Sequence, residues 1–288
     1  MSGEKRVSGV PGVPDYDAQV LREKHSDWCV LIPVINEGGR ILHELERAQN
    51  AGVPAQADVI VCDGGSTDGS MEQSGLAARG VNTLLVKKGP GRQGAQLRMG
   101  LHFALARGYR GVVTVDGNDK DSVEDVPRFL VKLREGYDFV QGSRFIRGGK
   151  AENTPPARWL AVRLLHAPVT SLAARRHYTD TTNAYRAYSR RYLTDPRVQP
   201  LRDVFMGYEL LAYLSTRAGR LGMHTCEVPV ARRYPKNAPA PTKIRGFAGN
   251  SDLLCILFAN ALGAYDPPRA AAQADADGHS AAQKGGRA

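Results

Sequence analysis

The sequence predicts an α/β protein with a mostly parallel central sheet and helices on both of its faces. The first observation is a regular alternation of short apolar runs with amphipathic segments through the first half of the chain. Such alternation indicates parallel strands, because each crossover helix covers one face of the sheet. The second observation is that Gly, Asp, Asn or Arg follows each apolar run, which is where ligands bind in sheets of this kind.

The alternating region is expected to contain five strands with a helix between each strand and the next. The strand segments are apolar runs bounded by polar or glycine-containing turns, and the helical segments carry apolar residues at three- and four-residue spacing. The expected strands are 28–34, 57–63, 81–88, 111–116 and 137–143, and the expected helices lie within 38–52, 64–80, 92–108 and 122–136.

The pattern changes near residue 150. Helices are expected within 155–177, 205–220 and 246–264, and a strand within 221–234, while 179–193 is polar and aromatic. We expect one domain over 26–265, divided into the halves 26–145 and 146–265. Residues 1–25 are expected to form a flexible arm and 266–288 a disordered tail, since both lack apolar periodicity.

The overall charge suggests anionic partners without choosing among them. Lys and Arg number 39 against 29 Asp and Glu, a formal charge of +10, which suits nucleic acid, an anionic membrane surface or phosphate-bearing ligands. Nucleic acid is not expected, because the basic residues do not interleave with aromatic ones. The first residues lack the apolar core of a signal peptide, and the apolar run 253–265 is shorter than the ~20 residues of a membrane span. A cytoplasmic protein is expected, soluble or peripheral on the inner face of the membrane.

Two strand ends carry the chemistry-bearing residues. The segment VTVDGNDKDSVEDVPRF (113–129) runs from a strand through a group of acids into a helix. Its carboxylate and amide oxygens are ligands for a hard cation, although such a group is also compatible with a solvated loop. The segment VCDGGSTDGS (61–70) places an Asp at a strand end before a tight turn with free backbone N–H groups.

Six segments, in this order, resemble glycosyltransferase family 2, and most of all its dolichol-phosphate mannose synthase or polyprenyl-phosphate glycosyltransferase branch. They are IPVINEGGRI, VIVCDGGSTDGS, KGPGRQGAQLRMGLHFA, VTVDGNDKDSVEDVPRF, FVQGSRF and DTTNAYRAYSRRYL. The resemblance covers about residues 28–245. It implies a GT-A fold, a GDP-, UDP- or dTDP-linked sugar donor, Mg²⁺ or Mn²⁺, and inversion at the anomeric carbon. Residues 26–145 would bind the nucleotide sugar and 146–265 the acceptor.

The same resemblance assigns roles to single residues. Those expected to bind the donor are Pro33, Asn36, Glu37, Asp63, Ser66, Asp68, Arg92, Gln96 and Lys120. Those expected to hold the metal are Asp116, Asn118 and Asp119. Asn118 stands where the family usually has a second Asp, and either Asp119 or Asp121 is expected to supply the missing charge. The expected catalytic residues are Asp116, Arg144, Asp180 and Glu209, and the expected acceptor- or phosphate-binding residues are Arg186, Arg233 and Lys243. Lys120 is also able to neutralise part of the diphosphate and lessen the dependence on metal.

The implied reaction is a one-step displacement of the nucleoside diphosphate by an acceptor oxygen. A polyprenyl phosphate, the expected acceptor, is already anionic and needs no base. The alternative, a hydroxyl on a glycan or small metabolite, needs a carboxylate base, for which Glu209 or Asp180 is expected. A nucleotidyltransferase is less favoured, because INEGGR follows the first strand in place of a basic glycine-rich loop. An inactive sugar-nucleotide binder is suggested only by Asn118. The last helix is expected to pack on the domain's own sheet, with docking on a bilayer as the alternative.

Overall fold

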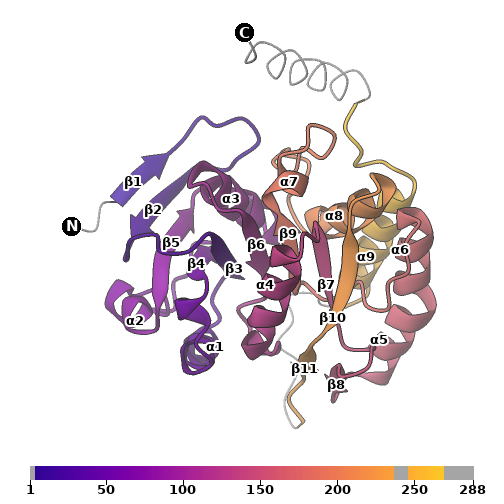
Figure 1. The fold of residues 1–288 in the computed structure, drawn as a ribbon, viewed down its shortest axis with the longest axis horizontal. Coiled ribbons are helices and arrows are strands. Elements are labelled where there is room, and N and C mark those ends of the chain that lie inside the picture. Colours follow the sequence, from indigo (N-terminus) through magenta and orange to yellow (C-terminus); the bar gives the residue numbers. More distant parts are fainter. Residues whose placement is uncertain (1–3, 237–245, 269–288) are drawn as a thin grey trace.

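The computed structural model describes residues 4–236 and 246–268, and these form one large sheet with a small one beside it (Figure 1). Within the described residues the large sheet has nine strands and the small sheet two. The strands of the large sheet are β1 (Glu4–Val7), β2 (Tyr16–Val20), β3 (Trp28–Val34), β4 (Asp58–Asp63), β5 (Val81–Lys87), β6 (Gly111–Thr114), β7 (Phe139–Ser143), β9 (Arg186–Ser189) and β10 (Thr225–Pro229). The strands of the small sheet are β8 (Lys150–Glu152) and β11 (Ala231–Arg233).

The order of strands in the large sheet is β1-β2-β5-β4-β3-β6-β9-β7-β10. The four neighbours β5, β4, β3 and β6 are parallel, so their carboxyl ends meet at one edge. The strand β9 is antiparallel to both β6 and β7, and β10 is parallel to β7. The α/β sheet predicted from the alternating first half of the sequence is confirmed.

Helices cover both faces of the sheet. They are α1 (Gly39–Asn50), α2 (Gln73–Ala78), α3 (Gln93–Ala106), α4 (Val126–Arg134), α5 (Pro156–Ala161), α6 (Ala167–Ala174), α7 (Arg190–Leu193), α8 (Glu209–Arg220) and α9 (Gly246–Ala261), with the shorter turns η1 (Val53–Ala55), η2 (Val123–Asp125) and η3 (Val162–His166). Alternate residues of β3 point to opposite faces: Leu31 joins one apolar cluster with α3 and α8, and Ile32 joins another with α1 and α4.

The expected flexible arm is wrong for the part of residues 1–25 that the structure describes. The strand β2 pairs with β5 and carries β1 on its outer edge, so the arm extends the sheet. Tyr16 and Ala18 are buried, and the Tyr16 hydroxyl lies 3.0 Å from His102 Nδ1. Their two-residue alternation is the signal of a strand, but it is short and lies among Gly and Pro residues. Of the expected disordered tail, residues 269–288 lie outside the described residues.

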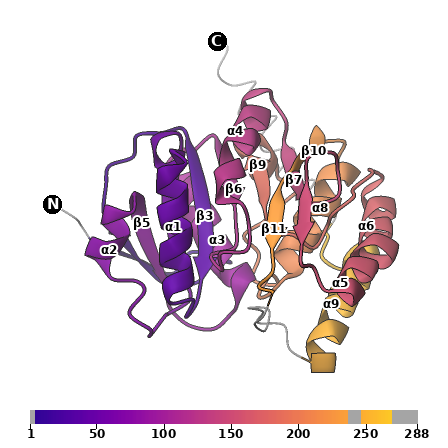
Figure 2. The same ribbon diagram turned by 90° about the horizontal axis from the view of Figure 1, so that it is seen from below.

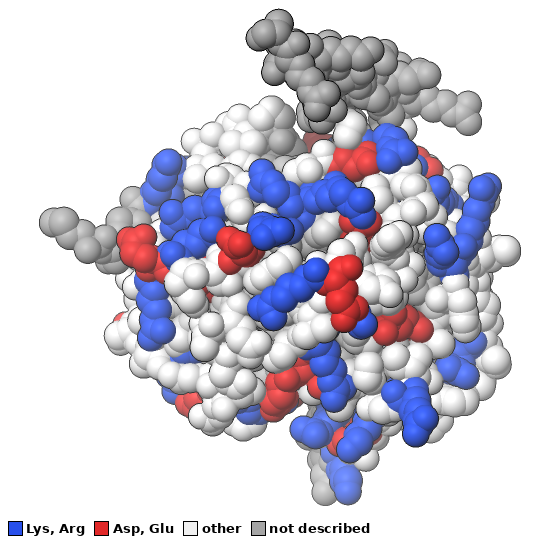
Figure 3. Space-filling model, in the orientation of Figure 1, with Lys and Arg blue, Asp and Glu red and all other residues white. Residues whose placement is uncertain are grey.

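The helix α9 packs on helices α6 and α8, and the expectation that it packs on the sheet is therefore corrected (Figure 2). Asn260 fixes it there, since its Nδ2 donates to Ala212 O at 3.0 Å and its Oδ1 accepts from the Thr216 hydroxyl at 3.1 Å. Among the described residues no helix has the length and apolar character needed to cross a membrane. Lys and Arg are spread over the face drawn in Figure 3, with Asp and Glu between them.

Candidate active site

A cavity of about 850 Å³ begins at the carboxyl ends of β3, β4 and β6 and continues between α5, α8 and α9. Its polar end is lined by Glu37, Arg92, Gln93, Gln96, Asp116, Asn118, Lys120, Arg158, Arg232 and Tyr234. Its apolar end is lined by Ala161, Val162, Leu165, Leu211, Leu253, Leu254, Ile256 and Leu257. Charged and apolar surfaces therefore share one continuous space.

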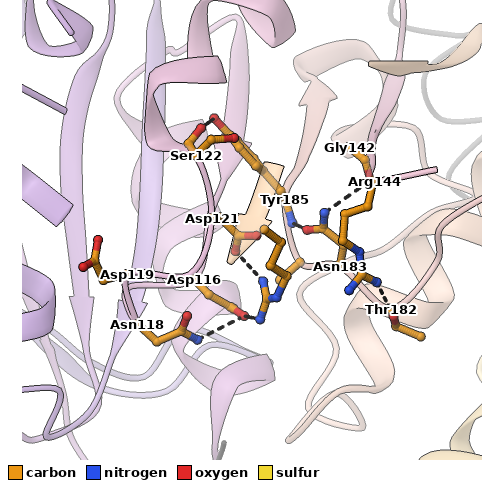
Figure 4. A network of polar contacts seen from close by, with 12 residues as sticks. Asp116, Asn118, Asp119, Asp121, Ser122, Gly142, Arg144, Thr182, Asn183 and Tyr185 are labelled. Atoms are coloured by element: carbon orange, nitrogen blue, oxygen red, sulfur yellow. Dashed lines mark hydrogen bonds and ion pairs between the residues drawn. The ribbon is translucent and has the colours of Figure 1, made fainter. Parts of the chain in front are cut away.

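Asp116, which follows β6, is the acidic centre of the polar end (Figure 4). Its Oδ1 accepts from Gln93 Nε2 at 2.6 Å, and its Oδ2 accepts from Asn118 Nδ2 at 3.4 Å. The intervening Gly117 packs against β3, where an added Cβ would come within 2.7 Å of Val34 Cγ2. Glycine is therefore needed to place Asp116 and Asn118 at this edge.

Arg232 lies between Asp116 and Asp121. Its Nη1 is 2.5 Å from Asp121 Oδ2, and its Nη2 is 3.4 Å from Asp116 Oδ2. Main-chain bonds hold the two segments together: Ser122 N donates to Ala231 O at 2.9 Å, and Arg233 N donates to Lys120 O at 2.8 Å. Burial raises the pKa of Asp121, and the adjacent Arg232 acts against that rise.

Further cations surround Tyr234 at the polar end. Arg158 Nη1 donates to its hydroxyl at 3.0 Å, and Lys120 Nζ lies 5.6 Å from its ring centroid. Burial opposes ionisation of this hydroxyl, but Arg232, Arg158 and Arg144 prevail and lower the pKa of Tyr234 to about 8. Lys120 is only 5% exposed, and burial together with Arg232 lowers its pKa. Convergent guanidinium and ammonium groups of this kind suit phosphate oxygens.

Part of the sequence-predicted donor set lines this cavity: Pro33, Glu37, Arg92, Gln96 and Lys120. Gln96 Nε2 donates to Val34 O at 2.5 Å and to Cys62 O at 2.9 Å, which ties the ends of β3 and β4 together. Glu37 also pairs with Arg40 at 2.6 Å on the outer side.

The rest of the predicted donor set shapes the neighbouring loop and is not among the residues lining the cavity. Asp63 accepts from Ser66 Oγ at 2.6 Å and from Ser66 N at 3.0 Å. Asn36 Oδ1 accepts from Thr67 N at 2.8 Å, and Asp68 Oδ2 accepts from Gly38 N at 2.8 Å. These side chains are therefore turn-forming groups in this conformation, as the tight turn predicted after this strand requires.

Asp119 is not brought to the predicted metal set. Its φ of 59° lies in the left-handed region, and its carboxylate pairs with His43 Nδ1 and Arg47 Nη1, each at 2.6 Å. Figure 4 shows Asp119 apart from Asp116 and Asn118 and directed away from them. The assignment of Asp119 as a metal ligand is corrected.

The residues at this edge do not fit a divalent cation as they are arranged. Asn118 Oδ1 and Asp121 Oδ1 are buried acceptors without a hydrogen-bond partner, which by itself favours a cation. However, the guanidinium of Arg232 already lies between the carboxylates of Asp116 and Asp121. Within residues 4–236 and 246–268, no three His, Cys, Asp or Glu side chains are grouped to hold a metal.

The expected catalytic residues Arg144 and Asp180 form a separate ion pair. Arg144 Nε lies 2.6 Å from Asp180 Oδ2, and Arg144 Nη2 donates to Asp180 Oδ1 at 2.9 Å. Their side chains are 1% and 0% exposed, and neither lines the cavity. The carboxylate of Glu209 is also absent from the cavity wall, since it turns back to the N–H of Gly207 at the start of α8. In this arrangement all three functional groups are engaged away from the cavity, and their catalytic roles stay predictions.

The three residues expected to bind the acceptor or its phosphate lie in different places. Arg186 lines the cavity, but its guanidinium donates to main-chain carbonyls, at 2.9 Å for Thr181 and 3.0 Å for Asn183. Arg233 points outward and pairs with Glu152 at 3.0 Å, so its assignment is corrected. Lys243 lies outside the described residues.

Sequence reasoning missed four residues of the polar end: Gln93, Arg158, Arg232 and Tyr234. A signal for the last two was present. Val228 and Val230 are buried, and residues at the same two-residue spacing along an extended segment point the same way. That spacing selects Arg232 and Tyr234 for the interior and leaves Arg233 outside.

Comparison with known proteins places this site in a family. The family description "Glycosyl transferase family 2" matches residues 29–195. The undecaprenyl-phosphate mannosyltransferase of Micrococcus luteus is 31% identical over 209 residues, which are 69% of this chain and 81% of that protein. The dolichyl-phosphate hexose transferase of Haloferax volcanii is 28% identical over 228 residues, covering 78% and 90% of the two chains.

Solved structures agree on the fold. Glucosyl-3-phosphoglycerate synthase of Mycobacterium tuberculosis, crystallised with Mn²⁺, UDP-glucose and phosphoglyceric acid, superposes with a TM-score of 0.57 at 19% identity. The superposition covers 84% of this chain and 81% of that one. The architecture is the GT-A fold, as the resemblance of the six segments implied. With the family description matching more than half of its length, this chain belongs to glycosyl transferase family 2.

Proposed function

We propose that this protein is an inverting glycosyltransferase that moves a sugar from a nucleotide-diphospho-sugar to a polyprenyl phosphate. The observation that carries the proposal is the single cavity in which a cationic polar end continues into an apolar end. An acceptor with an anionic head and a long apolar tail matches both ends at once. The names of the relatives from Micrococcus luteus and Haloferax volcanii, which act on undecaprenyl and dolichyl phosphates, support the same acceptor class.

The polar end suits the donor. Pro33 and Glu37, at the end of β3, border the space expected for the nucleoside. Lys120, Arg232 and Arg92 face the same space, where negative charge grows on the departing diphosphate. Groups fixed in advance around that charge stabilise the transition state more than the ground state, which is usually the largest electrostatic contribution to catalysis.

A phosphate acceptor is favoured over a hydroxyl, because the carboxylates of Asp180 and Glu209 do not line the cavity. A hydroxyl acceptor needs a base, and of the two carboxylates expected in that role Asp180 is paired with Arg144 and Glu209 turns back to the start of its own helix. A phosphate monoester oxygen is already anionic and attacks without losing a proton to the protein. Arg158 and Tyr234, which line the polar end, are placed to receive it.

Association with a membrane surface fits this acceptor. Large apolar side chains are exposed on α5, η3, α6 and α9, beside the apolar end. They are Trp159, Leu160, Leu164, Leu172 and Phe258, together with Leu262 directly after α9. Such residues favour the boundary between lipid head groups and acyl chains. A peripheral position would let a polyprenyl tail pass from the bilayer into the cavity.

A panel of GDP-, UDP- and dTDP-linked sugars tests the proposal. Each donor is incubated with undecaprenyl phosphate, with the phosphate-free polyprenol, and with hydroxyl acceptors, and labelled product is extracted into organic solvent. Transfer to the lipid phosphate alone is expected. Transfer to hydroxyl acceptors but to no lipid phosphate would refute the acceptor and leave the donor chemistry standing. The expected role of Mg²⁺ or Mn²⁺ stays a prediction, which the same panel addresses in chelator and in added metal.

A further inference from the structure

A protein cation lies between two carboxylates of the polar end, the buried Asp121 and the partly exposed Asp116. Arg232 contacts Asp121 at 2.5 Å and Asp116 at 3.4 Å, and Asp121 is completely buried. A second cation, Lys120, is 5% exposed and lines the same cavity. A buried carboxylate needs a counter-ion, and here the chain supplies it from its own residues.

Within the group Asp116, Asp121, Arg232 and Lys120, the charges balance without an added ion. Asp116 and Asp121 contribute two negative charges, and Arg232 and Lys120 contribute two positive ones. A divalent cation between two carboxylates would bring the same positive charge. Adding such an ion to the present arrangement would place it against a guanidinium, where like charges repel in a poorly hydrated site.

The position of Arg232 is built into the backbone. Ala231 O and Ala231 N both bond to Ser122, at 2.9 Å in each case, so β11 is fastened to the loop that carries Asp121. The side chain of Arg232 is 8% exposed and is held from two sides by Asp116 and Asp121. A guanidinium has five N–H donors, and the two ion pairs do not exhaust them, so it has further donors for a phosphate.

We propose that Arg232, assisted by Lys120, is the resident cation for the donor diphosphate, so that nucleotide binding and sugar transfer proceed without a divalent metal. The guanidinium suits this task, because it stays charged and matches phosphate oxygens in a bidentate manner. The transfer step rests on the proposed function, whereas nucleotide binding can be measured independently of it.

The first test is calorimetric titration of UDP, GDP and dTDP into the full chain, in EDTA and then with Mg²⁺ or Mn²⁺. At least one nucleotide is expected to bind in EDTA, with its affinity changed less than about threefold by either metal. Binding that requires metal, or no binding of any of the three, would overturn the proposal. Binding in EDTA with sugar transfer only after metal is added would also overturn it. Binding in EDTA with no transfer under either condition would support metal-independent binding and count against the proposed function.

The second test uses Arg232→Gln with Arg233→Gln as its matched control, since Arg233 is the adjacent, exposed residue of the same strand. Arg232→Gln is expected to weaken nucleotide binding in EDTA by about 100-fold, and Arg233→Gln by less than threefold. Freed from Arg232, Asp116 and Asp121 are also expected to bind Mn²⁺, which electron paramagnetic resonance detects directly. Equal affinities for the two variants would contradict the role of Arg232.

Arg232→Gln leaves Asp121 buried without its counter-ion, so a variant that keeps the charge is needed as well. Arg232→Lys is expected to retain metal-independent binding within about tenfold of the parent. Lys120→Gln removes the second cation while Arg232 still pairs with Asp121, and it is expected to weaken binding by about tenfold. The proposal would be overturned if both Arg232→Lys and Lys120→Gln bound the nucleotide with full affinity only when metal is present.

Discussion

Two arginine–carboxylate clusters lie near each other in this protein and serve different purposes. In one, Arg232 pairs with Asp116 and Asp121 and lines the cavity; in the other, Arg144 pairs with Asp180 and does not. Both contain a fully buried carboxylate, and family resemblance assigned Asp116 of the first cluster and both members of the second to catalysis. Burial and charge therefore do not define a catalytic pair, since the group must also reach the space where the substrates meet.

The largest effect is expected from the cluster that does not reach the cavity. Asp180→Ala leaves the guanidinium of Arg144 buried without a counter-ion, which should lower the free energy of unfolding by about 3–5 kcal/mol. Chemical denaturation measures the loss. Asp195→Ala, which removes the partner of the half-exposed Arg197, should cost at most about 1 kcal/mol. An Asp180→Ala protein with normal stability but no activity would show instead that Asp180 has a catalytic role.

The opposite result is expected in the cluster that lines the cavity. Asp116→Asn keeps the size of the side chain but removes the charge that positions Arg232 and accepts from Gln93. We expect kcat to fall by about 100-fold, the typical consequence of removing one preorganised electrostatic group. Circular dichroism and thermal unfolding should change little, because Asp121 still pairs with Arg232. A large loss of stability with kcat per folded molecule preserved would make this cluster structural too.

The sequence predicted the five alternating strands well because they are buried on both faces. Apolar runs such as 28–34 can be read without knowing their neighbours, and the helices between them follow from periodicity. The strand β2 was missed because its two buried residues, Tyr16 and Ala18, lie in a short edge strand among turn-forming residues. Its position depends on pairing with β5, which no local pattern specifies.

The candidate site was predicted less completely, for a related reason. Asp116, Asn118 and Lys120 follow a strand whose end marks the ligand edge, so their placement follows from topology. Arg232 arrives from more than a hundred residues later and meets Asp121 only through β11. The family resemblance pointed to Arg233 instead. The two-residue alternation of an extended strand distinguishes Arg232 from Arg233, but it applies only once the segment is known to be extended.

A third prediction concerns the apolar end of the cavity, where the polyprenyl tail is expected to lie. Leu165→Glu puts a carboxylate into the apolar end, whereas Leu172→Glu, in the following helix, changes a side chain that is 83% exposed and does not line the cavity. A charge in the path of the polyprenyl tail should raise KM for the lipid phosphate by about tenfold, since desolvating an unpaired charge is costly. KM for the sugar nucleotide should not change. Equal effects of the two substitutions would remove the apolar end from the acceptor site.

The smallest expected effect connects the two clusters through Tyr234, whose pKa of about 8 reflects Arg232, Arg158 and Arg144 acting against burial. Above that pH the tyrosinate cancels part of the positive charge of the polar end, so KM for the anionic donor should rise about two- to threefold between pH 7 and 9. The ion pairs of the tyrosinate exist only in the folded state, where its pKa is depressed from 10. Their contribution to stability should therefore be complete above pH 10 and lost as the pH falls through 8.

Tyr234→Phe should abolish both trends while leaving the ring in place. Steady-state kinetics at several pH values and tyrosinate absorbance of the parent against this variant measure them. The two possible results differ in which charged residues act on the donor. If Tyr234 titrates near pH 8 and KM for the donor changes over the same pH range, the cations around Tyr234 act on the donor. The positive charge that the donor meets then includes Arg144 as well as Arg232. If Tyr234 titrates near pH 8 and KM stays constant, the charge around Tyr234 stabilises the fold alone, and the functional field is confined to Arg232, Asp116 and Asp121.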